Sequence, residues 1–289
     1  MASAIHGENT VIFQEEWEEK LQEQLDAPTK WKEVCDVIYS DSYTINKPYH
    51  TDITVQTLER GTAYTYQGTT QTNESLTIST ARIAPEFIDR ADLSQSRYST
   101  QMHRAERQAV LLNEAIETNV LSLHANWTNF GNDAIGGSAG TITVSATNVD
   151  NIIRGIKREI REAAGESLMN RNGAFIIWRP AHLERVEEFA QANGFQTADI
   201  VLKNGVRQGF TLMDVDHYSS NFLSGGHVFA GVKKLNVVGI LKGTYGKVQV
   251  NDQDPGTRSG VGIVSQVDFG VLTPNNFVPV LFDVLCDAT

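Results

Sequence analysis

The longest uninterrupted helical pattern in the sequence runs from Ser99 to Ala125, and it constrains the fold more than any other feature. Apolar side chains recur there at steps of three and four residues, which places them on one face of an α-helix. The residues of this face are Met102, Ala105, Ala109, Leu112, Ile116, Val120 and Leu123. No proline or glycine interrupts the pattern, and Ser99 or Thr100 can cap its amino end. At about 1.5 Å per residue, we expect a helix roughly 35 to 40 Å long with one buried face.

The length and composition of the chain are those of a globular protein. Its 289 residues are 40% hydrophobic, which is enough to fill one large domain or two ordinary ones. The longest apolar runs, Ala174–Trp178 and Val278–Leu285, are far shorter than the roughly 20 residues that cross a bilayer, so we expect no membrane association. The first residues, MASAIHGENTVIFQEEWEEK, lack the basic region and apolar core of a secretory signal. We therefore expect synthesis and function in a cytosol.

Charge and cysteine content exclude further classes of function. The 24 Lys and Arg residues against 35 Asp and Glu residues give a formal net charge of -11. Such a charge opposes tight binding to phosphate backbones and argues against a nucleic-acid reader. Cys35 and Cys286 lie far apart, and neither belongs to a CxxC motif or a Cys/His cluster. We expect two free thiols and no metal or cofactor bound through cysteine.

The segment FQEEWEEKLQEQL, which starts at Phe13, predicts a short amphipathic helix that ends before Pro28. Its apolar side chains recur every four residues and form a single stripe, made of Phe13, Trp17, Leu21 and Leu25. A helix this short is marginal alone and needs a surface to lie on. That surface belongs either to the core of the chain itself or to a neighbouring subunit.

Residues 49–84 change in character and predict a long β-hairpin. Ten threonines lie between Thr51 and Thr80. Alternating apolar positions occur at Ile53 and Val55, Tyr64 and Tyr66, and Leu76 and Ile78. An isolated two-stranded hairpin is at best marginally stable in water, so this one must lean on something else. It is either an antiparallel edge of the main sheet or an arm laid across a partner.

The rest of the chain predicts an α+β fold. A second amphipathic helix from Val149 to Ala163, an apolar strand at Ala174–Trp178 and a helix from Pro180 to Ala192 follow the long helix. Most of the chain from Phe210 onward then has strand character. The predicted strands are Phe210–Val215, His227–Phe229, Asn236–Leu241, Gly246–Val250, Val261–Asp268 and Phe277–Leu285. Runs of strands around a few helices are typical of α+β rather than of strictly alternating α/β proteins.

Motifs that would indicate catalysis are scarce. The sequence has no GxSxG elbow, no HExxH and no P-loop. The densest group of titratable side chains is Asp214, Asp216 and His217, which could act as acid and base or ligate a metal. Strand alternation, however, would place Asp214 and Asp216 on one face and His217 on the other. A soluble α+β enzyme that uses this region is therefore the alternative to a binding or structural role, and we expect no catalytic, metal or cofactor site elsewhere.

The order of these features resembles the major capsid proteins of tailed bacteriophages, which have the Hong Kong 97-like fold. The resemblance extends over nearly the whole chain. Its segments are the hairpin Tyr49–Ala84, the long helix Ser99–Ala125, AFIIWRPAHLERVEEFA at Ala174–Ala190, FAGVKKLNVVGI at Phe229–Ile240 and VGIVSQVDFGVLTPNNFVPVLFDVL at Val261–Leu285. An encapsulin-like nanocompartment shell, which shares this fold and encloses enzymes, is a related alternative.

This resemblance implies a division of the chain into domains. Residues 1–48 would form an N-terminal arm and residues 49–84 an extended loop that reaches over an adjacent subunit. Residues 85–148 and 259–289 would form a peripheral domain around the spine helix 99–125, whose apolar face would back a sheet of the closing strands. Residues 149–258 would form an axial domain that meets its copies at the centre of pentamers and hexamers.

It also implies partners and a location. The shell would be icosahedral, would consist of copies of this chain and would enclose double-stranded DNA without sequence-specific binding. A separate scaffolding protein, a portal and, where the shell is reinforced, a decoration protein would be further partners. The shell would assemble in the cytoplasm of the host bacterium and become the capsid of the virion. No lysine lies between Lys47 and Lys157, so we expect a shell without covalent links through the extended loop.

Contacts between subunits would involve the arm, the extended loop and the polar side of the long helix. Association would supply the burial that these segments lack by themselves. The candidate subunit-interface residues are Phe13, Trp17, Leu21, Arg60, Tyr64, Tyr66, Arg104 and Arg107.

Overall fold

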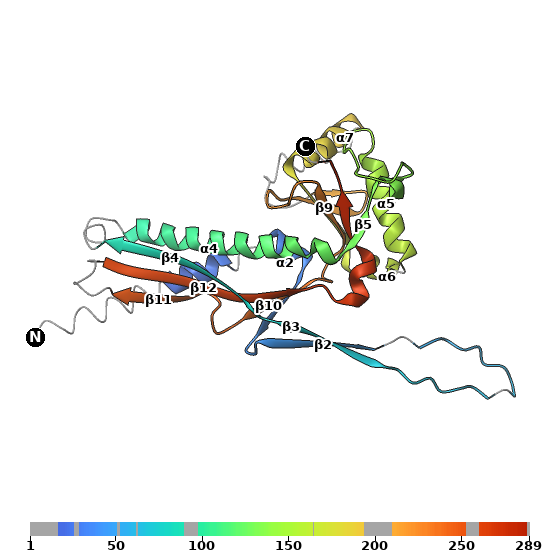
Figure 1. The fold of residues 1–289 in the computed structure, drawn as a ribbon, viewed down its shortest axis with the longest axis horizontal. Helices are drawn as coiled ribbons and strands as arrows, with labels where there is room; N and C mark the ends of the chain where they lie inside the picture. Colours follow the sequence, from blue (N-terminus) through green and yellow to red (C-terminus); the bar gives the residue numbers. More distant parts are fainter. Residues whose placement is uncertain are drawn as a thin grey trace, which may run out of the picture.

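The protein is an elongated α+β molecule with two lobes and a projecting hairpin (Figure 1). The structure is a computed structural model. It describes residues 17–25, 29–50, 53–61, 63–89, 98–163, 165–193, 210–252 and 260–287. Among the helices of these segments, none has the length and apolar composition needed to cross a bilayer.

Helix α4, Tyr98–Leu121, runs along strands β4, Thr80–Asp89, and β12, Gly260–Leu272, and ends at the base of the compact lobe (Figure 1). The predicted apolar face is buried wherever its side chains are described, from Ala105 to Leu123; the side chain of Met102 lies outside the described part. The α-helix ends four residues before the predicted Ala125, because the chain tightens into the 3-10 helix η1, Ser122–Asn126. The prediction of a long helix with one buried face is confirmed.

The long lobe consists of α4 and the five-stranded sheet beneath it. The strands of this sheet are β1 Asp36–Ser40, β10 Val237–Leu241, β12 Gly260–Leu272, β11 Lys247–Asp252 and β4 Thr80–Asp89. Strand β12 lies at the centre, where it pairs antiparallel with β4, β10 and β11. Alternate residues of β12, among them Ile263, Val267 and Phe269, are fully buried, and α4 packs on β12 and β4. The apolar face of the long helix thus backs a sheet centred on a late strand of the chain. The prediction of a sheet made of the closing strands is correct for β10, β11 and β12, but the early strands β1 and β4 complete the sheet and β13 is not part of it.

The compact lobe contains a six-stranded sheet and three α-helices (Figure 1). In spatial order, its strands are β5 Thr128–Phe130, β13 Leu281–Leu285, β9 His227–Val232, β6 Ala174–Trp178, β8 Val215–Ser219 and β7 Phe210–Leu212. The helices are α5 Val149–Glu162, α6 Glu166–Asn172 and α7 Pro180–Ala192. Every residue of β6 is buried, and Pro180 occupies the first turn of α7, as the sequence predicts.

Strand pairing departs from the domain borders expected from the sequence at several strands, among them β1 of residues 1–48, which pairs with β10, and β5 of residues 85–148, which pairs with β13. Strands β10 and β11 belong to the sheet of the long lobe, although they fall within residues 149–258. Strand β13 pairs with β5 and β9 of the compact lobe, although it falls within residues 259–289. Apolar alternation identifies a strand, but it does not identify the sheet in which a distant strand will pair. The chain therefore crosses between the lobes more often than contiguous borders suggest.

The remaining elements connect the lobes and the hairpin. They are α2 Lys30–Val34, β2 Thr44–His50, β3 Gln71–Thr77, η2 Asn132–Ile135 and η3 Asn275–Val280.

Candidate subunit interface

The projecting hairpin begins at a two-stranded antiparallel sheet formed by β2 and β3 (Figure 1). The register runs from Thr44 opposite Thr77 to His50 opposite Gln71. The hairpin thus starts five residues earlier than the predicted 49–84. Its predicted end, residues 80–84, belongs instead to β4, which pairs with β12 in the main sheet. The segment therefore contributes a strand to the main sheet from Thr80 onward, one of the two alternatives considered, while contact of the projecting part with a partner stays a prediction.

Beyond β2 and β3, glutamine side chains connect the two limbs of the hairpin tip, residues 53–61 and 63–70. The side chain of Gln56 donates to the carbonyl of Thr65 across 2.9 Å and accepts from its N–H across 3.2 Å. Gln67 accepts from the N–H of Thr54 across 2.8 Å. These bonds keep the two limbs in the register that β2 and β3 set, although no strand ladder continues there.

The tip presents apolar and aromatic side chains to solvent. Five of them are between 60% and 94% exposed: Ile53, Val55, Leu58, Tyr64 and Tyr66. Tyr64 and Tyr66 form a pair, with ring centroids 5.3 Å apart and hydroxyl oxygens 3.2 Å apart. Arg60, at the turn, is exposed as well. The structure thus brings two predicted interface residues, Tyr64 and Tyr66, together on an exposed apolar surface and places a third, Arg60, at the turn of the same hairpin; such a surface is typical of an interaction site.

The predicted residues of the long helix lie beside a groove between α4 and β4. Arg104 forms an ion pair with Glu86 of β4, with 3.2 Å between nitrogen and oxygen. Arg107 is exposed and lines the same groove, whose volume is about 450 Å³. The groove has apolar edges, because Ile83 and Leu111 are 58% and 46% exposed. Arg104 therefore already has a partner in its own chain, whereas Arg107 faces solvent.

Two candidate interface residues, Trp17 and Leu21, are buried within their own chain. Both are fully inaccessible to solvent, as is Leu25 of the same helical segment, residues 17–25. The polar side of this segment is fixed as well, since Glu18 pairs with Lys247 at the start of β11 across 2.9 Å. The amphipathic stripe finds an apolar surface in its own molecule, so the prediction that these two side chains lie on a neighbouring subunit is wrong. Phe13 lies outside the described residues.

The alternative site, Asp214, Asp216 and His217, does not form a reactive centre. His217 is fully buried, and its ring stacks between Trp178 and Phe210. Nδ1 of His217 accepts a hydrogen bond from Nε1 of Trp178 across 2.8 Å, and Nε2 lies 3.3 Å from the carbonyl oxygen of Leu212. Burial lowers the pKa of His217 to about 4. This imidazole is held neutral, with both nitrogens engaged away from solvent.

The two carboxylates of this segment face other partners. Asp216 accepts hydrogen bonds from Lys233 and Thr211, and their combined effect outweighs its partial burial and lowers its pKa. Asp214 precedes β8 in a left-handed turn, with φ of 61°, where its exposed carboxylate lies 3.3 Å from Nζ of Lys157. Because the three side chains point to separate partners, their geometry does not favour an acid–base or metal site.

Another group of chemically suitable side chains was not predicted from the sequence. His124, His227 and Asp283 come together at the junction of the two lobes. No local motif marks them, since Asp283 is 159 positions from His124 and 56 from His227. Only the three-dimensional fold could reveal this cluster.

No protein-family model and no curated protein matches this sequence. Solved structures do match, and their names describe capsids and particles. The capsid of Ralstonia phage GP4 is 8% identical, with a TM-score of 0.62 over 88% of this chain and 87% of the other. The capsid structure of cyanophage P-SCSP1u is 13% identical, with a TM-score of 0.56 over 91% and 89%. A virus-like particle from Pyrococcus furiosus is 11% identical, with a TM-score of 0.59 over 94% and 99%.

These similarities establish the fold. They extend over most of this chain and most of each compared chain, so they include both lobes rather than a shared fragment. The protein has the α+β fold of phage capsid subunits, the Hong Kong 97-like fold, as predicted from the order of its elements.

Proposed function

We propose that this protein is a major capsid protein, which assembles with copies of itself into pentamers and hexamers of an icosahedral shell around the double-stranded DNA of a tailed phage. The observation that carries the proposal is the projecting hairpin, whose apolar tip has no support from its own chain on a fold otherwise found in capsid subunits. A structural role in assembly, rather than catalysis, follows from this proposal.

A second copy of the chain is the partner that best fits the hairpin tip. Side chains such as Val55 and Leu58, which are 94% and 74% exposed, each gain roughly 1.5–3 kcal/mol when an apolar partner covers them. An arm that reaches from each subunit onto the next makes a head-to-tail contact, which closes into a ring when the rotation between subunits fits. Pentamers and hexamers are such rings.

We assign the lobes to the two capsid domains implied by the resemblance. The long lobe, with α4 as the spine helix, would be the peripheral domain. The compact lobe would be the axial domain and would meet its copies at the centre of each ring. Residues 1–48 would include the arm, although residues 17–25 pack on their own subunit, β1 adds a strand to the sheet of the long lobe and β2 begins the hairpin.

The negative net charge of the chain is consistent with a shell that encloses DNA. A net charge of -11 opposes tight binding of a subunit to DNA, which a shell must enclose and later release. A scaffolding protein, a portal and a decoration protein would be the other partners. Assembly in the host cytoplasm would yield the capsid of the virion. Because no lysine lies between Lys47 and Lys157, the shell would be held together without covalent links through the hairpin.

The test is assembly of the purified full chain, with and without co-expressed scaffolding protein, followed by size-exclusion chromatography and negative-stain electron microscopy. We expect capsomers, shells or tubes. A single small oligomer under every condition of salt, crowding and scaffold would overturn the proposal. The contents of purified particles would separate a phage shell, which holds DNA, from an encapsulin-like compartment, which holds protein.

Matched variants locate the contact on the hairpin. Tyr64→Ser should abolish assembly, because it removes half of the aromatic pair at the tip. Tyr43→Ser is the control, since Tyr43 is also 60% exposed but precedes β2 at the base of the hairpin. Equal loss of assembly in both variants would argue against a specific role for the tip.

A further inference from the structure

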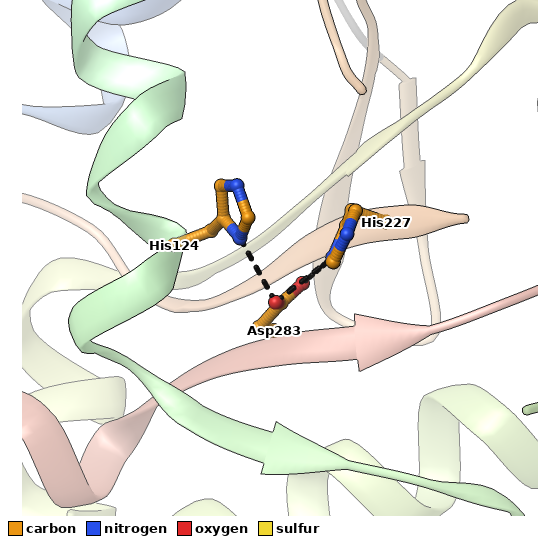
Figure 2. Close-up of side chains that lie close together, drawn as sticks. All are labelled: His124, His227 and Asp283. Atoms are coloured by element: carbon orange, nitrogen blue, oxygen red, sulfur yellow. Dashed lines mark hydrogen bonds and ion pairs between the residues drawn. The ribbon is translucent and has the colours of Figure 1, made fainter. Parts of the chain in front are cut away.

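Two histidines and one aspartate from three separate elements meet where the long helix ends (Figure 2). His124 lies in η1, which continues α4, while His227 is the first residue of β9 and Asp283 lies within β13. One donor atom from each side chain lies within 4.8 Å of the other two. In the described part of the chain, no other three His, Cys, Asp or Glu side chains come together in this way.

The donor atoms face one another across a small space (Figure 2). Nδ1 of His124 lies 3.0 Å from Oδ2 of Asp283, and Nδ1 of His227 lies 2.9 Å from both carboxylate oxygens. The two imidazole rings are themselves neighbours, with centroids 4.4 Å apart. Each ring therefore directs the same nitrogen toward the one carboxylate.

Sheet register fixes two of the three side chains. In the antiparallel pair β9–β13, His227 lies opposite Leu285 and Phe229 lies opposite Asp283. His227 and Asp283 are therefore diagonal neighbours on one face of the sheet. The third side chain, His124, rests against the ring of Phe229, with centroids 5.4 Å apart. All three are positioned by rigid elements rather than by loops.

The three side chains of the cluster differ in burial, and the difference would let an ion from solution reach the carboxylate. The side chain of Asp283 is only 4% exposed, so its charge is largely desolvated. The side chains of His124 and His227 are 23% and 26% exposed and leave the site open on one side. A cation can thus enter past the imidazoles and reach a carboxylate whose charge needs a partner.

We propose that His124, His227 and Asp283 form a binding site for a divalent transition-metal cation such as Zn²⁺. Two imidazole nitrogens and a carboxylate oxygen are ligands that this class of ion prefers, and a water would complete the coordination. A tetrahedral ion about 2.1 Å from each donor separates the donors by roughly 3.4 Å, so each imidazole nitrogen needs to move only about half an ångström away from its carboxylate oxygen.

The protons balance on binding. In the hydrogen-bonded cluster, Nδ1 of each imidazole is the donor, because an ionised carboxylate can only accept. Coordination needs the lone pair of each Nδ1, so each ring gives up its Nδ1 proton to water and takes up a proton from water at Nε2. Each ring thus keeps one proton, no net proton is released, and the cation occupies the place of the two hydrogen bonds. The ion would join the end of α4 to the sheet of the compact lobe and so fix the angle between the two lobes. This inference does not depend on the proposed assembly.

The test uses the full chain without a histidine tag, stripped with EDTA and titrated with Zn²⁺ or Co²⁺. We expect one equivalent to bind, with visible absorption bands of tetrahedral Co²⁺. We also expect Zn²⁺ in hundredfold excess over its Kd to raise Tm by about 5 °C, reversibly with EDTA. A wild-type protein that shows neither the bands nor the rise in Tm would overturn the proposal.

Variants locate the ion. His227→Ala and His124→Ala should each remove the cobalt bands and weaken Zn²⁺ binding at least tenfold. His103→Ala should change neither, because His103 is an exposed histidine that lies 3.0 Å from an acidic side chain, Glu106, but belongs to no group of three such ligands among the described residues. Should His227→Ala fail to fold, His227→Gln replaces it, and anomalous diffraction at the zinc edge then locates the ion directly. Binding that survives in the two cluster variants, or an ion found elsewhere, would refute the site.

Discussion

Gly239 of β10 and Gly270 of β12 lie directly opposite each other in the antiparallel register, and the base of the hairpin rests on them. A Cβ on Gly239 would lie 2.7 Å from Cδ1 of Ile45 and 2.8 Å from Cδ2 of Leu76. A Cβ on Gly270 would lie 2.3 Å from the carbonyl oxygen of Thr77. Two residues without side chains therefore let a second pair of strands approach the main sheet at this point.

Replacement of the glycine that meets backbone should disturb this packing. Gly270→Ala would place a methyl group against the Thr77 carbonyl, which cannot move as a side chain tip can. We expect a loss of about 1–3 kcal/mol in unfolding free energy, measured by urea denaturation, and fewer assembled particles. Gly243→Ala is the control, because nothing lies within 4 Å of the added carbon. Equal stability of the two variants would show that the hairpin base does not rest on Gly270.

Removal of the hairpin tip should separate folding from assembly. His50 pairs with Gln71, and the bonds between Thr54 and Gln67 keep the same register, so Asn-Gly in place of residues 54–67 would close a two-residue turn between Ile53 and Gly68. We expect an unchanged urea midpoint and no shells in electron micrographs, because the deleted side chains contribute nothing to the core. Global unfolding of this variant would instead make the tip part of the fold.

The amino-terminal helical segment should contribute to the stability of the single subunit. Trp17 is fully buried in its own chain, so Trp17→Ala should lower the unfolding free energy by about 3–5 kcal/mol. Lys20→Ala, which removes only an exposed ion pair with Glu23, should leave it nearly unchanged. Denaturant unfolding of the unassembled subunit would measure both changes in unfolding free energy. A Trp17→Ala subunit of normal stability that fails only in assembly would restore the interface interpretation.

Local periodicity explains which parts of the fold were predictable. The buried face of α4 is predictable because Ala105, Ala109 and Leu112 recur at the three- and four-residue spacing of an α-helix with one buried face. The same reasoning detected the stripe of Trp17 and Leu21, but it could not say which apolar surface the stripe would cover. An amphipathic pattern shows that a helix must bury its apolar face, but the tertiary fold determines which surface covers that face.

Long-range pairing explains what was missed. Strand β13 was recognisable as apolar, yet its neighbours β5 and β9 are set by register across more than fifty positions. The cluster of His124, His227 and Asp283 depends on that same pairing, so the spacing of these residues in the sequence does not predict it. Conversely, the spacing of Asp214, Asp216 and His217 in the sequence allows an acid–base or metal site, but strand alternation and a tight turn separate the three side chains.

The two cysteines should resist modification while the protein is folded. Both are free and buried, and burial raises the pKa of each thiol to about 12. Only on the order of one thiol in ten thousand is then ionised at pH 8, against about a quarter of free cysteine. We expect labelling by a disulfide reagent to be at least a thousandfold slower in the native protein than in urea, where both thiols react. Fast labelling of one thiol before unfolding would contradict the buried geometry.

Acid should destabilise the protein through His217. The pKa of this imidazole falls from about 6.5 in an unfolded chain to about 4 in the folded protein, because burial penalises its charged form. Between these values the unfolded chain binds the extra proton and the folded chain does not. The stabilising contribution of neutral His217 is therefore complete above pH 6.5 and decreases as the pH falls toward 4, by up to about 3 kcal/mol.

The hydrogen bonds around His217 give this prediction a specific control. Protonation would place a hydrogen on Nδ1, where Nε1 of Trp178 already donates, so the charged ring loses a bond as well as its hydration. His217→Asn keeps an acceptor near Nδ1 but does not titrate, so it should flatten the dependence of the urea midpoint on pH between 7 and 4.5. His50→Asn, at an exposed position of β2, should keep the wild-type slope. The lowered pKa of His182 acts in the same direction but is common to all three proteins, so the difference between their slopes isolates His217. Parallel slopes for wild type and His217→Asn would mean that the buried imidazole does not control stability in acid.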